Sequence, residues 1–456
     1  MLSSKKNIHF VGIAGIGMSG LAQVLLELGH QVSGSDPRAN SLTRKIQSKG
    51  GRVFSEHCWQ NIIGSDVVVY SSAVKMDNPE LVMAREKGIP VIQRAKMLSE
   101  LMKGKTAIAV AGTHGKTTTT SLVSIVLQQA GLNPTALVGG EVNDFGGNVM
   151  LGNGRYFVAE ADESDGSFLY LKPVYSVITN IEEDHLDFYK NLDDIITVYR
   201  RFADNTSPEG ILFYHQADKN INRCLAGYKG RCSGFGFQAS ADLSATNIKL
   251  KGFASEFDCS YKGDFLGRVR VPLPGRHNIL NALAAIGVGM KTGIDFDRII
   301  NILAGYSGVA RRFQVRLDID KITIIDDYAH HPTEIEATLK GCQNMQRRII
   351  CVFQPHRYSR TKYFNKQFAN AFCLADRLIL ADIYPADEEA IPGINSRLIY
   401  EQISKDKRKN AYLVSTKQQA LEKVIEIFEP KDLVLIMGAG DIGCVADELV
   451  RIYGDG

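Results

Sequence analysis

The chain has 456 residues, of which 45% are hydrophobic and 23% charged, and its formal net charge at pH 7 is +3. This length suggests roughly three domains, and so balanced a charge gives no reason to expect nucleic acid as a partner. No hydrophobic stretch approaches the ~20 residues of a membrane-spanning helix and no signal-peptide core is visible, so we expect a cytoplasmic protein without a membrane partner, whose eight cysteines are free thiols.

Short hydrophobic strands alternate with helical periodicity along almost the whole chain, which is typical of α/β folds with parallel sheets. We divide the chain into domains at 1–104, 105–307 and 308–456. The first and third are predicted to be Rossmann-like, and the second to be a P-loop-type ATPase domain. Within the second, short alternating stretches rich in glycine from Ile211 to Leu273 predict a small antiparallel β insertion.

A glycine-rich turn follows the first predicted strand. Gly15, Gly17 and Gly20 form the pattern G-x-G-x-x-G immediately before a helix. In a Rossmann fold such glycines let the backbone approach a diphosphate at the N-terminus of the helix. The first domain is therefore predicted to bind a nucleotide diphosphate.

Polar side chains end two further strands of the first domain. One strand ends at Asp36, where Rossmann folds place a carboxylate near a ribose. Another is followed by Ser71 and Ser72, at an edge where open parallel sheets bind ligands. For these two hydroxyls, ligand binding and the closing of a turn are equally good interpretations.

The second domain opens with a strand, a turn of sequence G-T-H-G-K-T-T at residues 112–118, and a helix. Backbone N–H groups at such a helix start bind phosphate oxygens, Lys116 would neutralise the β- and γ-phosphates, and the Thr117 hydroxyl would reach Mg²⁺. Val110 stands where the common P-loop pattern requires glycine. The motif predicts ATP binding, and a solvated lysine in an ordinary turn is the alternative.

Acidic residues and a histidine end the next two strands. Four acids lie within the stretch Glu160–Asp165, and carboxylate oxygens suit Mg²⁺ beside phosphates. Glu160, nearest the strand, is the favoured ligand, and a solvated acidic loop is the alternative. His185 follows the neighbouring strand and is a second candidate ligand, although a lone histidine is more often structural. Two cations around a triphosphate suit transfer of the γ-phosphoryl group.

Amides and arginines follow later in the chain. Asn278 and Asn281 open a helix, where one of them is suited to bind adenine and where helix capping by Asn278 is an equal alternative. Arg312 lies near the start of the third domain and is placed to reach a phosphate. Arg357 and Arg360 would face the same way on a first helical turn. A pair of guanidinium groups is suited to clamp a small carboxylate, and a surface patch is the alternative.

Together these segments resemble the ATP-dependent peptidoglycan-precursor ligases, the Mur ligase family, over nearly the whole chain. The resemblance rests on the following motifs, in this order: F-V-G-I-A-G-I-G-M-S-G-L-A, G-T-H-G-K-T-T-T, E-A-D-E-S-D-G-S-F, T-N-I-E-E-D-H-L-D, G-R-H-N-I-L-N-A-L-A-A, D-D-Y-A-H-H-P-T-E and F-Q-P-H-R-Y-S-R-T. Within the family the chain is similar to the branch that joins L-alanine to UDP-N-acetylmuramate. The resemblance implies one domain each for the UDP-substrate, ATP and the amino acid.

The resemblance also implies the reaction. ATP phosphorylates the muramyl carboxylate to an acyl phosphate, and the alanine amine attacks that carbonyl and displaces phosphate. The implied cofactors are ATP and Mg²⁺, or Mn²⁺ in its place, and the implied partners are UDP-N-acetylmuramate and L-alanine. The expected oligomeric state is a monomer or a homodimer.

Four groups of site residues follow from the resemblance. ATP binding is implied for Gly112, Thr113, His114, Gly115, Lys116, Thr117, Thr118, Asn278, Asn281, Arg312 and Asp327. Metal binding is implied for Thr117, Glu160 and His185, and UDP-substrate binding for Gly15, Gly17, Ser19, Gly20, Asp36, Ser71 and Ser72. The amino-acid pocket comprises Tyr328, His330, His356, Arg357 and Arg360. The catalytic residues among them are Lys116, Glu160, His185 and His330.

The sequence departs from the family at Arg200, where sister ligases carry a carbamylated lysine, and has Ala14 and Ala329 where relatives often have glycine. Three other functions compete with alanine ligation: a nicotinamide-dependent dehydrogenase, an ATP-gated interaction protein, and the related ligase that attaches recycled murein tripeptide to the same nucleotide. The sequence does not decide among L-alanine, glycine and L-serine as acceptor, because a few methyl contacts determine that choice.

Overall fold

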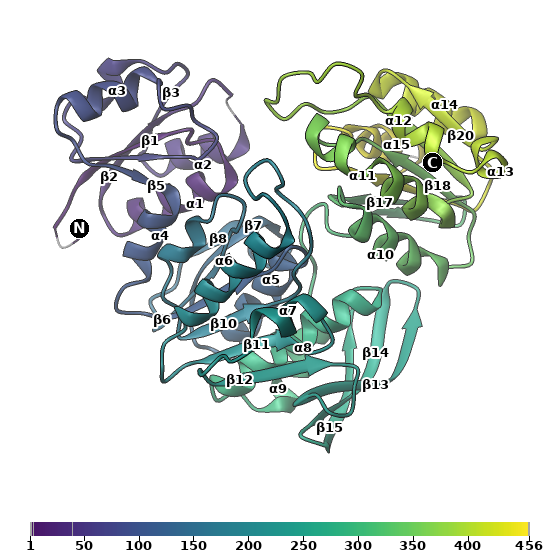
Figure 1. The fold of residues 1–456 in the computed structure, drawn as a ribbon, viewed down its shortest axis with the longest axis horizontal. Helices are drawn as coiled ribbons and strands as arrows, with labels where there is room; N and C mark the ends of the chain where they lie inside the picture. Colours follow the sequence, from purple (N-terminus) through teal and green to yellow (C-terminus); the bar gives the residue numbers. More distant parts are fainter. Residues whose placement is uncertain (1, 3, 39, 455–456) are drawn as a thin grey trace. The chain divides into compact units, whose positions relative to one another are not determined.

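The computed structural model describes residues 2, 4–38 and 40–454. Three sheets form the cores of three α/β domains, as predicted (Figure 1). The chain divides into two compact units, which are described separately. The first comprises Met1–Thr246, Cys259–Gly267 and Leu280–Tyr306, and the second comprises Asn247–Asp258, Arg268–Ile279 and Ser307–Gly456. The domain boundaries at 104 and 307 stay a prediction.

The first sheet is parallel throughout, with the strand order β3-β2-β1-β4-β5 of a Rossmann-like domain. Its strands are β1 (Asn7–Val11), β2 (Gln31–Ser35), β3 (Arg52–Phe54), β4 (Val67–Tyr70) and β5 (Val91–Gln93). The helices are α1 (Ile16–Glu27), α2 (Ser41–Ser48), η1 (Trp59–Ile62), α3 (Pro79–Glu86) and α4 (Arg94–Met102). Because the strand order reverses beside β1, the carboxyl ends of the strands there form the ligand-binding edge of such a sheet.

The second sheet has ten strands in the order β15-β14-β13-β12-β11-β10-β6-β9-β7-β8. These are β6 (Thr106–Ala111), β7 (Thr135–Val142), β8 (Gly147–Met150), β9 (Tyr156–Glu160), β10 (Tyr175–Ile178), β11 (Ile211–His215), β12 (Cys232–Gly236), β13 (Leu243–Lys251), β14 (Ala254–Tyr261) and β15 (Asp264–Val271). The helices are α5 (Lys116–Gln129), η2 (Asn143–Phe145), η3 (Ser167–Tyr170), α6 (Leu192–Asp204), α7 (Lys219–Cys224), α8 (Arg276–Lys291) and α9 (Phe296–Ala304).

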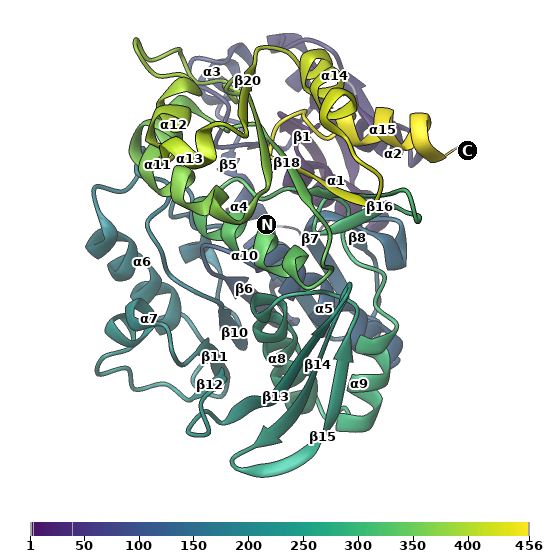
Figure 2. The same cartoon turned by 90° about the vertical axis from the view of Figure 1, so that its right-hand side faces the viewer.

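The predicted β insertion begins later than expected. β11 pairs in parallel with β10, and β12 pairs in parallel with β11, so both continue the main sheet. Only β13, β14 and β15 form a meander, and they lie side by side with two-residue connections that join antiparallel strands (Figure 2). The prediction that the insertion starts at Ile211 is wrong. A short hydrophobic stretch indicates a strand but does not reveal whether that strand pairs in parallel or antiparallel with its neighbour.

The third sheet has the order β16-β17-β21-β18-β19-β20. Its strands are β16 (Gln314–Asp318), β17 (Ile322–Asp327), β18 (Ile349–Phe353), β19 (Arg377–Ala381), β20 (Ala411–Val414) and β21 (Asp432–Met437). The helices are α10 (Pro332–Gln343), α11 (Tyr358–Ala371), η4 (Phe372–Leu374), α12 (Arg397–Gln402), α13 (Lys405–Arg408), α14 (Lys417–Ile427) and α15 (Cys444–Gly454). The edge strand β16 is antiparallel to β17, and the other pairs are parallel. Helices α14 and α15 lie side by side (Figures 1 and 2).

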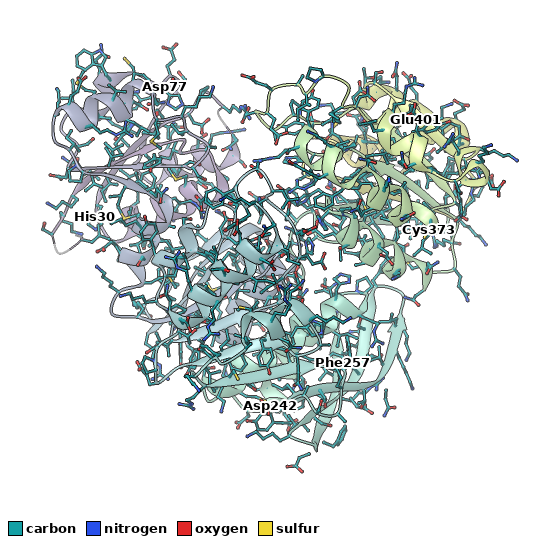
Figure 3. All side chains as sticks on the ribbon, viewed as in Figure 1. His30, Asp77, Asp242, Phe257, Cys373 and Glu401 are labelled. Carbon is teal, nitrogen blue, oxygen red and sulfur yellow. The ribbon has the colours of Figure 1, made fainter. Side chains whose placement is uncertain are left out.

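The cysteines agree with the prediction of free thiols. All eight lie within the described residues and none of them is in a disulfide; four are buried, whereas Cys373 is exposed (Figure 3). Across the described part of the chain, no helix combines the length and hydrophobicity that crossing a membrane requires.

Candidate active site

The glycine-rich turn between β6 and α5 needs glycine at two positions. Gly112 has φ of +138°, and a Cβ there would overlap the Thr179 hydroxyl. Gly115 caps α5 with φ of +81°, and a Cβ there would lie 2.6 Å from Asn281 Oδ1. Both backbone conformations are ones that residues with a Cβ rarely adopt. Glycine therefore brings this turn against two neighbouring elements, β10 and α8.

The carboxyl end of β10 holds the turn in place. Asn180 accepts hydrogen bonds from the Thr113 N–H through its backbone oxygen at 3.0 Å and from the His114 N–H through Oδ1 at 2.8 Å. The Thr179 hydroxyl donates to the His114 carbonyl at 2.6 Å. β6 and β10 pair in register up to Ala111, so the two strand ends meet at one edge, as the sequence predicted for this turn and the segment carrying His185.

The Lys116 side chain reaches back, so its ammonium lies within the glycine-rich turn that precedes this residue in the sequence. It donates to the Gly112 carbonyl at 2.6 Å and to Glu163 Oε1 at 2.8 Å. Burial alone would lower the pKa of Lys116, but the charges of Glu163 and Asp162 outweigh burial and raise it. The lysine is therefore a fixed positive charge at the start of α5, where a helix N-terminus already favours anions.

Within the acidic stretch, Glu163 rather than Glu160 contacts the lysine. Glu160 ends β9, and its Oε1 accepts the Gly139 N–H at 2.5 Å. Glu163 is 3% exposed, and its Oε2 is buried without a hydrogen-bond partner among the described residues. Burial raises the pKa of Glu163, although Lys116 opposes that shift. The sequence pattern indicates the acidic stretch, but the position nearest the strand favours Glu160 as the ligand.

The structure brings His185 to the same place. Its Nε2 lies 3.8 Å from Glu163 Oε1 and 3.8 Å from Asp184 Oδ2, and its φ of +53° is unusual for a residue with a side chain. Arg200, in contrast, lies on α6 and binds Asp204 and the Ala226 carbonyl, at 3.0 Å and 2.7 Å. Lys116, Glu163 and His185 thus form one cluster, called the Lys116 cluster below.

The two asparagines of α8 have different surroundings. Asn281 Oδ1 accepts a hydrogen bond from the Thr119 hydroxyl at 3.2 Å, beside the glycine-rich turn. Asn278 donates from Nδ2 to the Pro274 carbonyl at 2.8 Å. Because α8 begins at Arg276, Asn278 lies inside its first turn. Capping by Asn278, the alternative interpretation, is therefore wrong.

In the N-terminal domain, α1 begins within the G-x-G pattern, with Gly15 as its N-cap and Gly17 in its first turn. Asp36 Oδ2 accepts the Ala14 N–H at 3.0 Å, so this carboxylate holds the turn. Ser19 is fully buried, and its hydroxyl donates to the Ile16 carbonyl of its own helix. These contacts build the predicted edge, and the ligand roles assigned to Gly15, Ser19 and Asp36 stay predictions.

The remaining UDP-substrate residues lie along the same domain. Ser71 is half-buried and Ser72 exposed, and Ser71 Oγ accepts the Ala73 N–H at 3.4 Å. That contact belongs to a turn, so it favours the second of the two interpretations. Gly20 lies under Leu137 of β7, since a Cβ on it would be 3.0 Å from Leu137 Cδ2.

Arg94 is a residue that sequence analysis missed. It opens α4, and a Cβ on Gly17 would lie 2.9 Å from its Nη1. Its Nη2 donates to Asp162 Oδ2 at 2.9 Å. Burial alone would raise the pKa of Asp162, but Arg94 and Lys116 lower it to about 2. A guanidinium therefore lies between the predicted diphosphate turn and the acidic stretch, and no local pattern in the sequence marks it.

In the second unit, Asp327 ends β17 and is buried. Its Oδ1 accepts the Ala329 N–H at 2.7 Å and its Oδ2 accepts the Phe313 N–H at 3.0 Å. Burial raises the pKa of Asp327 to about 6. The Arg312 guanidinium lies over the Tyr328 ring, 4.8 Å from its centroid. Asp327 thus fixes the backbone that carries two other predicted residues.

Most of the predicted amino-acid pocket is brought together. The His330 ring centroid lies 5.5 Å from that of Tyr328 and 5.8 Å from that of His356. Arg360 Nη1 lies 3.4 Å from His356 Nδ1, and the side chain is buried. Arg357 precedes α11 with φ of +73°, so the expectation that both arginines lie on the first helical turn is wrong. Because Arg357 has a positive φ and lies outside the helix, helical spacing does not determine the direction of its side chain.

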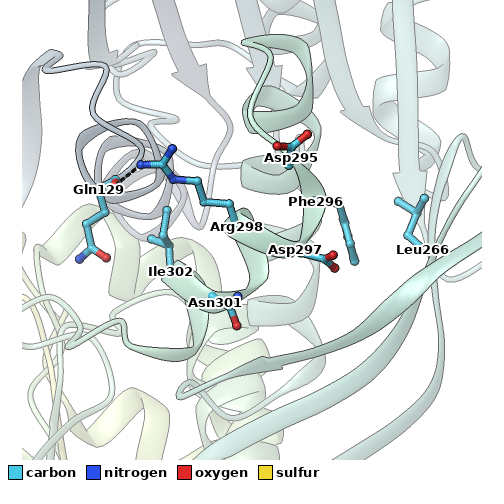
Figure 4. Close-up of a pocket in the computed structure, with 8 residues that line it drawn as sticks. All are labelled: Gln129, Leu266, Asp295, Phe296, Asp297, Arg298, Asn301 and Ile302. Carbon is cyan, nitrogen blue, oxygen red and sulfur yellow. Dashed lines mark hydrogen bonds between the residues drawn. The ribbon is translucent and has the colours of Figure 1, made fainter.

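A cavity of about 800 Å³ lies elsewhere in the first unit, beside α9 (Figure 4). It is lined by Gln129, Leu266, Asp295, Phe296, Asp297, Arg298, Asn301 and Ile302. Arg298 crosses it to donate to the Gln129 carbonyl at 3.1 Å. Its lining includes none of the residues that the sequence predicted for a site, so it is separate from the Lys116 cluster.

Comparison with known proteins gives matches along the whole chain. Three family models match: "Mur ligase family, catalytic domain" over residues 7–106, "Mur ligase middle domain" over 110–289, and "Mur ligase, glutamate ligase domain" over 311–440. The UDP-N-acetylmuramate–L-alanine ligase of Geotalea uraniireducens (strain Rf4) is 46% identical over 457 residues, covering 100% of both chains. The ligase of the same name from Pelotomaculum thermopropionicum is 42% identical, covering 99% of this chain and 98% of its own.

Solved structures give the same result. The crystal structure of UDP-N-acetylmuramate-alanine ligase from Thermotoga maritima is 30% identical, with a TM-score of 0.83 and 99% of each chain covered. The murein peptide ligase from Psychrobacter arcticus 273-4 is 24% identical, with a TM-score of 0.73 and 99% of each chain covered, and it shares the fold.

Proposed function

The chain belongs to the Mur ligase family, and from this premise we propose that it joins L-alanine to the carboxylate of UDP-N-acetylmuramate, in a reaction that converts ATP to ADP and phosphate. This is the reaction of peptidoglycan precursor synthesis for which its full-length relatives are named. The observation that carries the proposal is the Lys116 cluster, in which a partly buried ammonium lies at the N-terminus of α5 beside a buried carboxylate and a histidine. That constellation suits phosphoryl transfer and leaves a hydride-transfer function unsupported.

The turn at residues 112–118 binds the phosphates of ATP through backbone N–H groups at the start of α5. The γ-phosphoryl group passes to a carboxylate oxygen of UDP-N-acetylmuramate, giving an acyl phosphate and ADP. The Lys116 ammonium stabilises the charge on the transferred group. In this structure the same ammonium donates to Glu163 and to the Gly112 and Thr113 carbonyls, so nucleotide binding must exchange one of these three contacts for a phosphate oxygen while the others hold the lysine in place.

The first unit also fits a divalent cation. Glu163 presents a buried carboxylate oxygen with no hydrogen-bond partner among the described residues, and carboxylates are the ligands that Mg²⁺ prefers. Thr117, Glu160, Glu163 and His185 are the side chains that would hold Mg²⁺, or Mn²⁺ in its place. Bound there, the cation would supply positive charge to the β- and γ-phosphates. Glu163 adds to the predicted ligands. It also gives a negative charge to the site, which the carbamylated lysine gives in sister ligases and which Arg200, at that position here, does not.

The second unit binds the amino acid. Arg357 and Arg360 clamp the carboxylate of L-alanine, and Tyr328, His330 and His356 line the pocket around it. His330 lies beside the Tyr328 and His356 rings, and we assign to it the uptake of the proton that the attacking amine releases. The amine attacks the acyl phosphate, and the tetrahedral intermediate expels phosphate. Asp327 and Arg312 of the same unit remain the residues predicted for ATP there, and Asn278 and Asn281 on α8 remain those predicted for adenine.

The N-terminal domain binds the UDP part of the substrate at Gly15, Gly17 and Asp36. Arg94 adds a guanidinium beside that turn, which suits a diphosphate. The cytoplasmic location and the state of monomer or homodimer stay predictions. ATP as a substrate supports the former.

A coupled assay of ADP release tests the proposal. The purified chain is given ATP, Mg²⁺ and UDP-N-acetylmuramate, with L-alanine, glycine, L-serine or murein tripeptide as the acceptor. We expect L-alanine to give the highest kcat/KM. A strong preference for the tripeptide would favour the ligase that recycles it, and no ADP release with any acceptor would favour an ATP-gated interaction protein. Thermal stabilisation by NAD but not by UDP-N-acetylmuramate would favour a dehydrogenase.

A further inference from the structure

A buried carboxylate, Glu80, collects polar side chains from several elements of the N-terminal domain. Its Oε1 lies 2.7 Å from Asn61 Nδ2 and 3.3 Å from His9 Nε2. Its Oε2 lies 2.5 Å from Ser35 Oγ and 3.1 Å from His57 Nδ1. Glu80, His9 and Ser35 have no exposed surface. Because a buried carboxylate is stable only with hydrogen-bond donors around it, these five side chains form one connected group, called the Glu80 network below.

An ionised Glu80 requires a donor at each of its hydrogen-bonded neighbours. Burial alone would raise the pKa of Glu80, but hydrogen bonds from its partners, His9 first, lower it, so the carboxylate is ionised and accepts only. His9 therefore donates from Nε2, and its Nδ1 lies 2.8 Å from Ser33 Oγ. Ser35 donates its one proton to Glu80. His57 Nδ1, 2.9 Å from Ser35 Oγ, must then carry a proton and donate.

The network lies where β2 ends, beside the proposed UDP site. Ser35 is the last residue of β2, and its carbonyl accepts the Gly12 N–H at 2.9 Å. Asp36 follows directly, and its Oδ2 accepts the Ala14 N–H at 3.0 Å. The position of Ser35 therefore sets two anchors of the glycine-rich turn, one through its own carbonyl and one through the next residue.

We propose that Glu80 is a positioning residue for the UDP-substrate. Its carboxylate holds Ser35 and His57, and through them it holds the end of β2, Asp36 and the glycine-rich turn in the arrangement that binds the uridine diphosphate. Glu80 does not touch the reacting atoms, so its effect falls on the binding of one substrate. The inference rests on the function proposed for the N-terminal domain, because it requires that this turn binds the UDP part.

Glu80→Gln tests the proposal. A glutamine amide has one acceptor oxygen and one NH₂ group, so either His9 with Asn61 or Ser35 with His57 loses its acceptor. We expect KM for UDP-N-acetylmuramate to rise about tenfold, the equivalent of losing one hydrogen bond to a charged group. The Kd for UDP alone, measured by titration calorimetry, should rise by a similar factor. We expect kcat and the KM values for ATP and L-alanine to stay within about twofold.

Two comparisons separate positioning from general stability. Asp432→Asn alters a matched buried carboxylate in the third sheet, bound by Arg348 at 2.6 Å and 2.8 Å, and should lower Tm without changing KM for UDP-N-acetylmuramate. His57→Asn keeps an amide nitrogen near the position of Nδ1 and should retain more affinity for UDP than His57→Ala. His57 is 25% exposed in its side chain, so both of its variants should fold.

The proposal is overturned if Glu80→Gln lowers Tm as Asp432→Asn does but leaves the affinity for UDP and for UDP-N-acetylmuramate unchanged. It is also overturned if His57→Asn and His57→Ala bind UDP equally well. Failure of the wild-type chain to release ADP would instead contradict the proposed reaction, and the calorimetric comparison would still test Glu80.

Discussion

Lys116→Ala is expected to lower kcat by at least about 10²- to 10³-fold, the effect of removing one preorganised group that stabilises transition-state charge. The ammonium is held at the N-terminus of α5 by the Gly112 carbonyl and by Glu163, so no reorganisation of solvent is needed when phosphoryl charge develops. Lys103→Ala is the matched control, because that lysine is 67% exposed and pairs only with Glu100 among the described residues. The coupled ADP-release assay measures both variants.

The stability of the Lys116 variant distinguishes loss of chemistry from loss of fold. Removing the lysine leaves Glu163 buried without its cation, which costs about 3–5 kcal/mol unless the carboxyl takes up a proton. The double variant Lys116→Ala/Glu163→Gln removes that charge as well. We expect its Tm to recover toward the wild-type value while kcat stays low. A near-normal rate for Lys116→Ala would remove the phosphate role from this residue.

Arg360→Lys is expected to raise KM for L-alanine by about 10- to 100-fold, because a charge-assisted hydrogen bond contributes about 1.5–3 kcal/mol and an ammonium cannot bind a carboxylate with two parallel bonds. Arg360 is buried beside His356, where its guanidinium is protected from solvent and held in position. KM for ATP and for UDP-N-acetylmuramate should stay within about twofold.

The control for the clamp lies in the same domain. Arg451 is exposed on α15 and pairs with Glu448, so Arg451→Lys should leave all three KM values unchanged. Initial rates at varied L-alanine, with the other two substrates saturating, give the comparison. An unchanged KM for L-alanine in Arg360→Lys and in Arg360→Ala would contradict the clamp.

The sequence predicted the elements that local patterns encode. Hydrophobic strands followed by glycine, lysine or acidic residues identified β1, β6, β9 and β10 in the first two sheets, because the pattern and the turn chemistry lie within a few residues of one another. The proximity of the glycine-rich turn to the segment that carries His185 followed from the pairing of parallel strands.

Contacts between distant segments were not predictable in this way. Arg94 and Asp162 are 68 positions apart, and nothing in the surrounding sequence distinguishes this arginine from a surface residue. Glu160 was favoured over Glu163 because it lies nearer the strand. The chain after β9 turns back, however, so the residue three positions later contacts the lysine. The positive φ of Arg357 likewise moved a residue off the helix that spacing alone assigned to it.

The central claim is that the turn at residues 112–118 activates the carboxylate of UDP-N-acetylmuramate by phosphoryl transfer. Oxygen labelling tests this most directly: UDP-N-acetylmuramate with ¹⁸O in its carboxylate is converted with ATP and L-alanine, and the released phosphate is analysed by mass spectrometry. An acyl phosphate requires that a carboxylate oxygen leaves with the phosphate, so we predict phosphate that carries the label from the carboxylate. Unlabelled phosphate, formed together with the alanine amide, would contradict the account.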